Sequence, residues 1–211
     1  MSETDTAADA VTESDAVAEP DRGELWTRIT AWVLVIGGAI AFVASFVLTY
    51  EKLELLSDPN YKPSCSINSV FSCSPVMASW QASLFGFPNP LIGIAGFAVV
   101  ITVGMGILAG ARYANWFWGG LQLGVTLAMA FVLWLIYSSL YDIGALCLYC
   151  MVVWSMTIPL FVVVTVRNLM ATRTQPSRAL VAIAPYVPVI VFVCYMFVAA
   201  AILDRFWTAL F

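Results

Sequence analysis

The chain has 211 residues, of which 62% are hydrophobic and only 10% are charged, and its formal net charge is −4. Its mean hydropathy of +0.91 excludes the ordinary soluble classes and predicts an integral membrane protein. The chain contains no histidine, so it lacks the commonest general base and a common metal ligand. We therefore expect no metal site, and thiols remain as the obvious redox groups. We also expect no nucleic-acid partner.

The N-terminal segment 1–24 holds eight of the thirteen acidic residues and no periodic apolar pattern, which predicts a disordered acidic tail. The membrane domain is expected to fill 25–211. Within it, the uncharged run 29–50 is long enough to cross a bilayer at about 1.5 Å per residue, so it predicts the first membrane helix. A cleavable signal peptide is disfavoured, because the residues before this run are acidic and the run is long.

The segment 51–88 is polar and rich in turn residues, so it predicts a loop outside the membrane. The loop carries Cys65 and Cys73. Cys65 lies in a polar stretch and is expected to be flexible and accessible. A structural disulfide between the two, which would only staple the loop, is the alternative.

A short half-helix is predicted over 75–84, with Ser74 as its cap and Pro75 at the first helical position. Cys73 would then lie at a helix N-terminus. The partial positive charge there favours a thiolate, which makes Cys73 a good attacking or leaving group.

Four more uncharged runs, each bounded by charges or turn residues, predict membrane helices over 91–110, 115–137, 145–166 and 179–203. Two GxxxG spacings in these runs, Gly106 to Gly110 and Gly120 to Gly124, predict close helix packing within one bundle. We expect a monomer.

The orientation follows from the positive residues beside the predicted helices. Six arginines would lie on the side of the N-terminus: Arg22, Arg28, Arg112, Arg167, Arg173 and Arg178. The opposite side would hold Lys52, Lys62 and Arg205. This asymmetry predicts a cytoplasmic N-terminus and an extracytoplasmic loop 51–88.

A CxxC pair, Cys147 and Cys150, opens the predicted fourth helix, with Asp142 as a candidate N-cap. Two thiols three residues apart on a helix share one face, so they can open and close a disulfide with little backbone movement. The alternative is a pair of small buried residues in a membrane helix. Under the predicted topology the loop pair, Cys65 and Cys73, and the CxxC pair all lie on the oxidising side of the membrane. Cys194 lies within the last helix and is expected only to pack.

Several spacings together resemble the vitamin K epoxide reductase family over 31–166. The loop has two cysteines eight residues apart, the second within Phe71-Ser72-Cys73-Ser74. Asn89 and Gly93 lie at the entrance of the second helix, and the CxxC of Cys147 and Cys150 opens the fourth. The resemblance implies an all-α integral membrane fold in which a four-helix bundle surrounds a quinone, here with a fifth helix. Bacterial members often continue into a thioredoxin-like domain. Since the chain ends at Phe211, we expect a separate thioredoxin-fold partner.

The resemblance also implies a relay of thiols. A reduced thioredoxin-fold partner attacks a Cys65–Cys73 disulfide at Cys65, and Cys73 then attacks a Cys147–Cys150 disulfide at Cys147. Cys150 is released facing the quinone and passes the electrons on. This sequence of events requires a mobile loop.

For the quinone, the family uses a polar residue at the entrance of the second helix, which Asn89 matches, and a hydrogen-bonding side chain one turn beyond the CxxC. Trp154 stands at that second position, where the animal enzymes have a tyrosine, and its indole N–H can donate. Phe85, Phe87 and Tyr149 are candidate stacking residues, and ordinary interfacial aromatics are the alternative for these three.

The leading functional hypothesis is a quinone-linked thiol oxidase of the bacterial cytoplasmic membrane that supports disulfide formation in exported proteins. A vitamin K epoxide reductase of an endoplasmic reticulum is the first alternative, because the same thiols would serve it. A non-catalytic scaffold or transporter with structural cysteines is the second. It is disfavoured because the predicted spans contain no charge that would mark a solute path.

Overall fold

The computed structural model describes residues 22–58, 60–68, 70–171 and 184–210. The described residues form helices and loops, and five of the helices are long and apolar enough to cross a membrane. The predicted class, an all-α integral membrane protein, is therefore confirmed. Of the predicted acidic tail, 1–21 lies outside the described residues, and the last three residues of that prediction already belong to the first helix.

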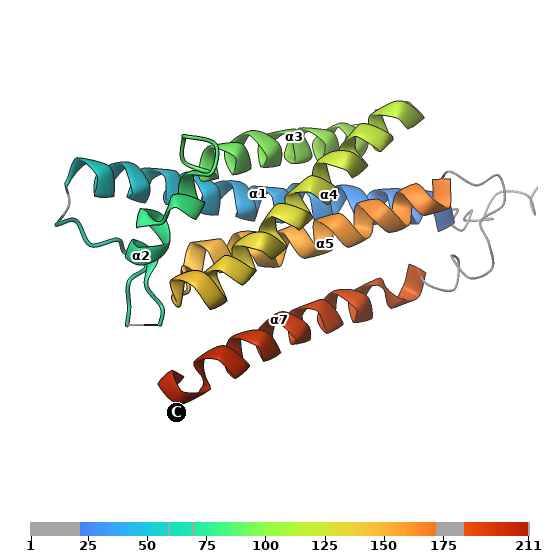
Figure 1. The fold of residues 1–211 in the computed structure, drawn as a ribbon. Helices are drawn as coiled ribbons and strands as arrows, with labels where there is room; N and C mark the ends of the chain where they lie inside the picture. Colours follow the sequence, from blue (N-terminus) through green and yellow to red (C-terminus); the bar gives the residue numbers. More distant parts are fainter. Residues whose placement is uncertain (1–21, 59, 69, 172–183, 211) are drawn as a thin grey trace, which may run out of the picture.

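The five long helices run through most of the described chain, as Figure 1 shows. Their bounds are α1 Arg22–Ser57, α3 Pro90–Leu108, α4 Asn115–Tyr137, α5 Leu148–Ala171 and α7 Val187–Leu210. A short 3₁₀ turn, η3 (Ala184–Tyr186), precedes α7. Residues 179–183 of the predicted fifth helix lie outside the described part of the chain.

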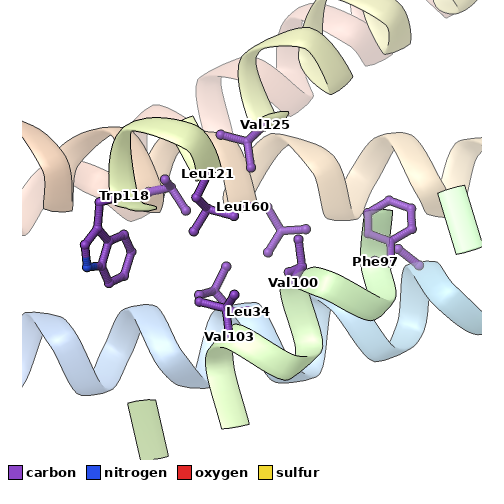
Figure 2. Close-up of a cluster of buried hydrophobic side chains, with 10 residues drawn as sticks. Leu34, Phe97, Val100, Val103, Trp118, Leu121, Val125 and Leu160 are labelled. Carbon is purple, nitrogen blue, oxygen red and sulfur yellow. The ribbon is translucent and has the colours of Figure 1, made fainter. Parts of the chain in front are cut away.

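Helices α1, α3 and α5 lie side by side, α4 crosses α5, and α7 packs along α5 (Figure 1). A cluster of buried apolar side chains lies between the first four of these long helices (Figure 2). Leu34 of α1, Val100 of α3, Leu121 of α4 and Leu160 of α5 are each less than a tenth exposed. Within the described chain, the backbones of α3 and α4 do not pack closely against each other, and their side chains meet in this cluster.

Two glycines allow α1 and α3 to approach closely. A Cβ on Gly38 would lie 2.9 Å from Cγ1 of Ile101, and a Cβ on Gly104 would lie 2.9 Å from the carbonyl oxygen of Ala31. Real Cβ atoms do not tolerate such distances, so a larger residue at either position would push the helices apart.

The two GxxxG spacings predicted close helix packing at other glycines, and this prediction is wrong. A Cβ on Gly120 or Gly124 would meet nothing within 4 Å, so these two do not bring helices together. Gly106 faces the Tyr113 side chain, and Gly110 ends α3 with a φ of +88°. The spacing alone does not say which face of a helix is packed.

The end of the bundle at which α1 ends and α3 begins is called here the loop end. It carries a short helix, α2 (Cys73–Ala78), and a 3₁₀ turn, η1 (Trp80–Ser83). The half-helix predicted over 75–84 is thus broken in two, because Ser79 adopts an extended ψ of 153°. It also begins earlier than predicted, with Ser72 rather than Ser74 in the N-cap position.

Helix α4 continues at the loop end into a π-helical turn, η2 (Ser138–Ile143). Gly144 ends this turn with a φ of 69°, a left-handed conformation that glycine adopts without strain. Its N–H donates to the carbonyl of Ser139 at 3.0 Å. The chain then runs without helix to Cys147 before α5 begins at Leu148.

Candidate redox site

Four cysteines from two distant parts of the chain meet at the loop end. Cys65 and Cys73 form a disulfide, while Cys147 and Cys150 are free thiols. The Sγ atoms of Cys73 and Cys147 lie 2.9 Å apart. Cys65, Cys73 and Cys147 are all at most 3% exposed. The contact between Cys73 and Cys147 makes a thiol–disulfide exchange between the two pairs geometrically direct.

A short backbone contact holds the two halves of this site together. Phe71 and Leu146 form an isolated parallel β-bridge. The N–H of Ser72 donates to the carbonyl of Leu146 at 3.0 Å, and the N–H of Leu146 donates to the carbonyl of Val70 at 2.8 Å. Each bridge residue lies one or two positions before a cysteine of this site, so the bridge fixes Cys73 beside Cys147.

Cys147 directly precedes the first residue of α5. The pKa of its thiol lies below the usual value, because the Cys150 thiol donates a hydrogen bond to it and the backbone N–H groups of Cys150 and Tyr149 add two more. Burial and the negative charge of Glu51 act in the opposite direction. Backbone donors of this kind are free in the first turn of any helix.

Two predictions for the start of the fourth membrane helix are wrong. Asp142 does not cap α5, because it lies within η2. The predicted start of the fourth helix at 145 is too early, because Leu146 is engaged in the bridge to Phe71. Cys147 therefore precedes the helix instead of lying in its first turns, and Cys150 lies within the first turn.

Cys65 is expected to be flexible and accessible, and its accessibility is contradicted by the structure. Only 3% of Cys65 is exposed, and it packs in a cluster with Leu48, Val76 and Met77. A protein partner cannot reach its sulfur in this arrangement. Exchange with a partner therefore requires the segment around Cys65 to move.

Glu51 holds the segment that carries Cys65. Its carboxylate, in a residue only 4% exposed, accepts hydrogen bonds from the N–H of Ser64 at 3.2 Å, the Ser64 hydroxyl at 2.5 Å and the Tyr61 hydroxyl at 3.1 Å. The Ser64 hydroxyl also lies 3.2 Å from the hydroxyl of Tyr149, inside the CxxC sequence. The carboxylate thus links α1 to both cysteine pairs.

Lys52, the next residue, holds the other half of the loop. It is 6% exposed, and its Nζ donates to the carbonyl of Met77 at 2.8 Å and to Oγ of Ser83 at 2.7 Å. Met77 lies in the last turn of α2, where helix carbonyls lack partners and favour a cation. These bonds explain why α1 continues beyond Tyr50, where the predicted helix ended.

A cavity of about 920 Å³ lies beside the cysteines and is lined by residues of α1 to α5, η1 and η2. This volume is typical of sites for small molecules and cofactors. Cys150 lines the cavity, whereas Cys147 does not. On α3 and α4 the wall includes Gly96, Gly120 and Gly124, at which a Cβ would meet nothing within 4 Å.

Three of the five predicted quinone contacts line this cavity, namely Asn89, Trp154 and Phe85. Asn89 is 7% exposed, and its amide nitrogen donates to the carbonyl of Gln81 at 2.6 Å, which ties the entrance of α3 to η1. The remaining two, Phe87 and Tyr149, lie outside the cavity wall.

Three groups with a place in this site were not identified from the sequence, namely Glu51, Lys52 and Ser64. The two charges were interpreted only as the point where the chain leaves the membrane. A signal was present, because the two charges lie directly after a long apolar run and can turn inward onto the loop. Ser64 had no local signal.

The sulfur atoms of Cys65, Cys73 and Cys147 lie within 4.8 Å of one another, a group that a thiophilic metal could contact when all are reduced. In the structure two of them are joined by the disulfide. Cys194, the fifth cysteine, is a free thiol in α7 and lies outside this group.

A comparison with protein-family models finds one whose description is vitamin K epoxide reductase family, and it matches residues 32–165. The matched range contains the two cysteine pairs, Asn89 and Trp154. It ends before α7.

Proposed function

The chain belongs to the vitamin K epoxide reductase family, a family of membrane thiol–quinone oxidoreductases, and we propose that it oxidises a thioredoxin-fold dithiol protein and passes the electrons to a membrane quinone. In this role it supports disulfide formation in proteins exported across a bacterial cytoplasmic membrane. The observation that carries the proposal is the 2.9 Å contact between Cys73 and Cys147 beside a cavity that Cys150 lines.

The first exchange takes place at the loop pair. A thiolate of the partner attacks Cys65, its sulfur–sulfur bond to Cys73 breaks, and Cys73 leaves as a thiolate. The second thiol of the partner then displaces Cys65 and the partner leaves as a disulfide. The cluster around Cys65 must open for this step, and the position of Cys73 at the start of α2 stabilises it as a leaving group.

The second exchange moves the electron pair inward. The Cys73 thiolate attacks the Cys147–Cys150 disulfide at Cys147, and Cys150 leaves as a thiolate at the cavity wall. Cys65 then displaces Cys147 from Cys73, which restores the loop disulfide and leaves two thiols in the CxxC. The structure has this oxidation state, with Cys65 bonded to Cys73 and the CxxC reduced.

The quinone is the terminal acceptor. It takes two electrons and two protons from the CxxC dithiol, whose sulfurs join in a disulfide as the quinol forms. The mostly apolar cavity suits a lipid-soluble ring and holds it beside Cys150, away from bulk water. We place the loop end on the extracytoplasmic side, which the distribution of positive charges favours.

The test supplies purified protein with a reduced thioredoxin-fold protein and one acceptor at a time: a menaquinone, a ubiquinone or a vitamin K epoxide. Reduction of a quinone is expected, and it should stop in Cys147→Ala and Cys150→Ala. Cys194→Ala is the matched control and should keep the activity. A partner that lacks its second cysteine should stay joined to Cys65 of the wild type in a mixed disulfide, because it has no thiol that can displace Cys65. Quinone-dependent oxidation of the partner by Cys150→Ala protein would refute the proposal.

A further inference from the structure

Ser138, a residue of the cavity wall, has a buried hydroxyl without a hydrogen-bond partner. Ser138 is 1% exposed. Of all the residues that the structure describes, it supplies the one buried side-chain oxygen or nitrogen without a partner. A hydroxyl removed from water without a new hydrogen bond is unfavourable, and native proteins keep few of them. An unpaired hydroxyl directly behind a cavity wall therefore points to a polar ligand group, which it would meet when the serine side chain turns toward the cavity.

Several threonine hydroxyls in the membrane helices are satisfied by the backbone of their own helix, and the hydroxyl of Ser138 is not. The hydroxyls of Thr126, Thr157 and Thr165 donate to the carbonyls four residues earlier, at 2.7, 2.8 and 2.7 Å. Ser138 makes no such bond and lies where α4 passes into the π-helical turn η2. Turns of this type inside helices occur frequently at functional sites, because they change the direction of side chains.

The position of Ser138 matches the place where a quinone ring would react. It lines the same cavity as Cys150, Asn89 and Trp154. Turn η2 and the start of α5, which carries Cys150, lie at the same end of the bundle (Figure 1). Most residues around the cavity are apolar, so a single hydroxyl there can decide how a ring with polar oxygens is oriented.

We propose that the hydroxyl of Ser138 donates a hydrogen bond to a carbonyl oxygen of the quinone bound beside Cys150. This assignment rests on the proposed function and names a donor where the chain has Trp154 in place of the tyrosine of the animal enzymes. The hydroxyl keeps its proton throughout. The bond strengthens as the oxygen gains negative charge during reduction, so Ser138 assists the transfer as well as the binding.

The experiment compares two probes on the same protein, a methylated naphthoquinone and the corresponding methylnaphthalene, which lacks both carbonyl oxygens. Each probe displaces a radiolabelled isoprenoid quinone from purified protein in micelles. Ser138→Ala should bind the naphthoquinone roughly threefold to tenfold more weakly, the usual value of one hydrogen bond. It should bind methylnaphthalene as well as the wild type does. The matched control is Ser155→Ala on α5, because its hydroxyl is satisfied by the carbonyl of Val152 and it lies outside the cavity wall.

The outcomes separate this assignment from the proposed function. If the labelled quinone binds the wild type and Ser138→Ala binds both probes as the wild type does, the assignment of Ser138 is wrong. An equal loss for both probes also overturns it, because such a loss reports a change of cavity shape. If the wild type binds no labelled quinone, the proposed function itself fails. Since the comparison is made within one variant, a general loss of folded protein cannot imitate the expected result.

Discussion

Gly120 offers a test of where the tail of a quinone lies. It lines the cavity near the start of α4, and a Cβ there would meet nothing within 4 Å. Ser138 lies eighteen residues further along the same helical path, which corresponds to roughly 27 Å at the usual rise. A ring held beside Cys150 and Ser138 cannot reach Gly120. Only an isoprenoid tail extends that far.

Gly120→Leu should therefore weaken the binding of long-tailed quinones and leave a tail-less naphthoquinone unaffected. Inserting a side chain into an occupied apolar site costs about 1–3 kcal/mol, which corresponds to roughly a 5- to 150-fold weaker affinity. The helix itself should gain stability, because leucine favours a helix over glycine by about 0.8–1 kcal/mol. The assay is the KM for quinones of increasing tail length, measured with a reduced thioredoxin-fold protein as donor.

Gly119→Leu is the matched control. Gly119 is exposed, a Cβ there also meets nothing within 4 Å, and it does not line the cavity. It should leave the KM unchanged for every quinone. The reasoning is refuted if both leucine variants raise the KM equally, or if Gly120→Leu affects the tail-less quinone as strongly as the long-tailed ones.

Two further predictions concern the thiols and the loop. In a chain whose loop cysteines are replaced by serine, Cys150→Ala removes the main donor that lowers the pKa of Cys147. The pH midpoint of thiolate formation, followed by ultraviolet absorbance, should therefore move upward. An unchanged or lower midpoint would contradict the proposed hydrogen bond. Glu51→Gln replaces a carboxylate that accepts hydrogen bonds from Ser64 and Tyr61. A hydrogen bond to a charged group contributes about 1.5–3 kcal/mol, so maleimide labelling of Cys65 in the reduced protein should become at least about tenfold faster. Glu54→Gln is its control, and equal acceleration by both variants would show that Glu51 has no special role.

The membrane helices could be predicted because their signal is local. A long uncharged run can satisfy its backbone only as a helix in a bilayer, whatever the rest of the chain does. The family motif likewise depends on short spacings, so the sequence alone singles out the four cysteines that meet at the loop end. The contact between the two pairs followed from the family relay, and the structure brings Cys73 and Cys147 together as that relay requires.

The errors arose where distant segments meet. The two charges after Tyr50 predict that the first helix ends there, yet Glu51 and Lys52 are buried by the loop that folds back on them. The polar neighbours of Cys65 predict that it is accessible, yet the Ser64 hydroxyl donates a hydrogen bond to the buried carboxylate of Glu51. No local pattern contains this information, because each charge is satisfied by residues at least ten positions away.

The same limit applies to the cavity. The unpaired hydroxyl of Ser138 exists because α4 changes into a π-helical turn at that residue, which a spacing of apolar residues does not indicate. Gly120 and Gly124 have the spacing of packed glycines and instead line open space. A sequence pattern identifies small residues, and the arrangement of the helices decides whether they bring helices together or leave room for a ligand.

The β-bridge between Phe71 and Leu146 separates the two exchange steps of the proposed relay by their expected rates. It ties Cys73 and Cys147 through backbone hydrogen bonds, so their exchange is a reaction within one molecule at a very high effective concentration. Cys65 lies before the bridge in the chain and is held by side-chain packing and by the hydrogen bonds of its neighbour Ser64. The outer cysteine can therefore leave to meet a partner while the inner two stay in place, and partner encounter is expected to set the overall rate.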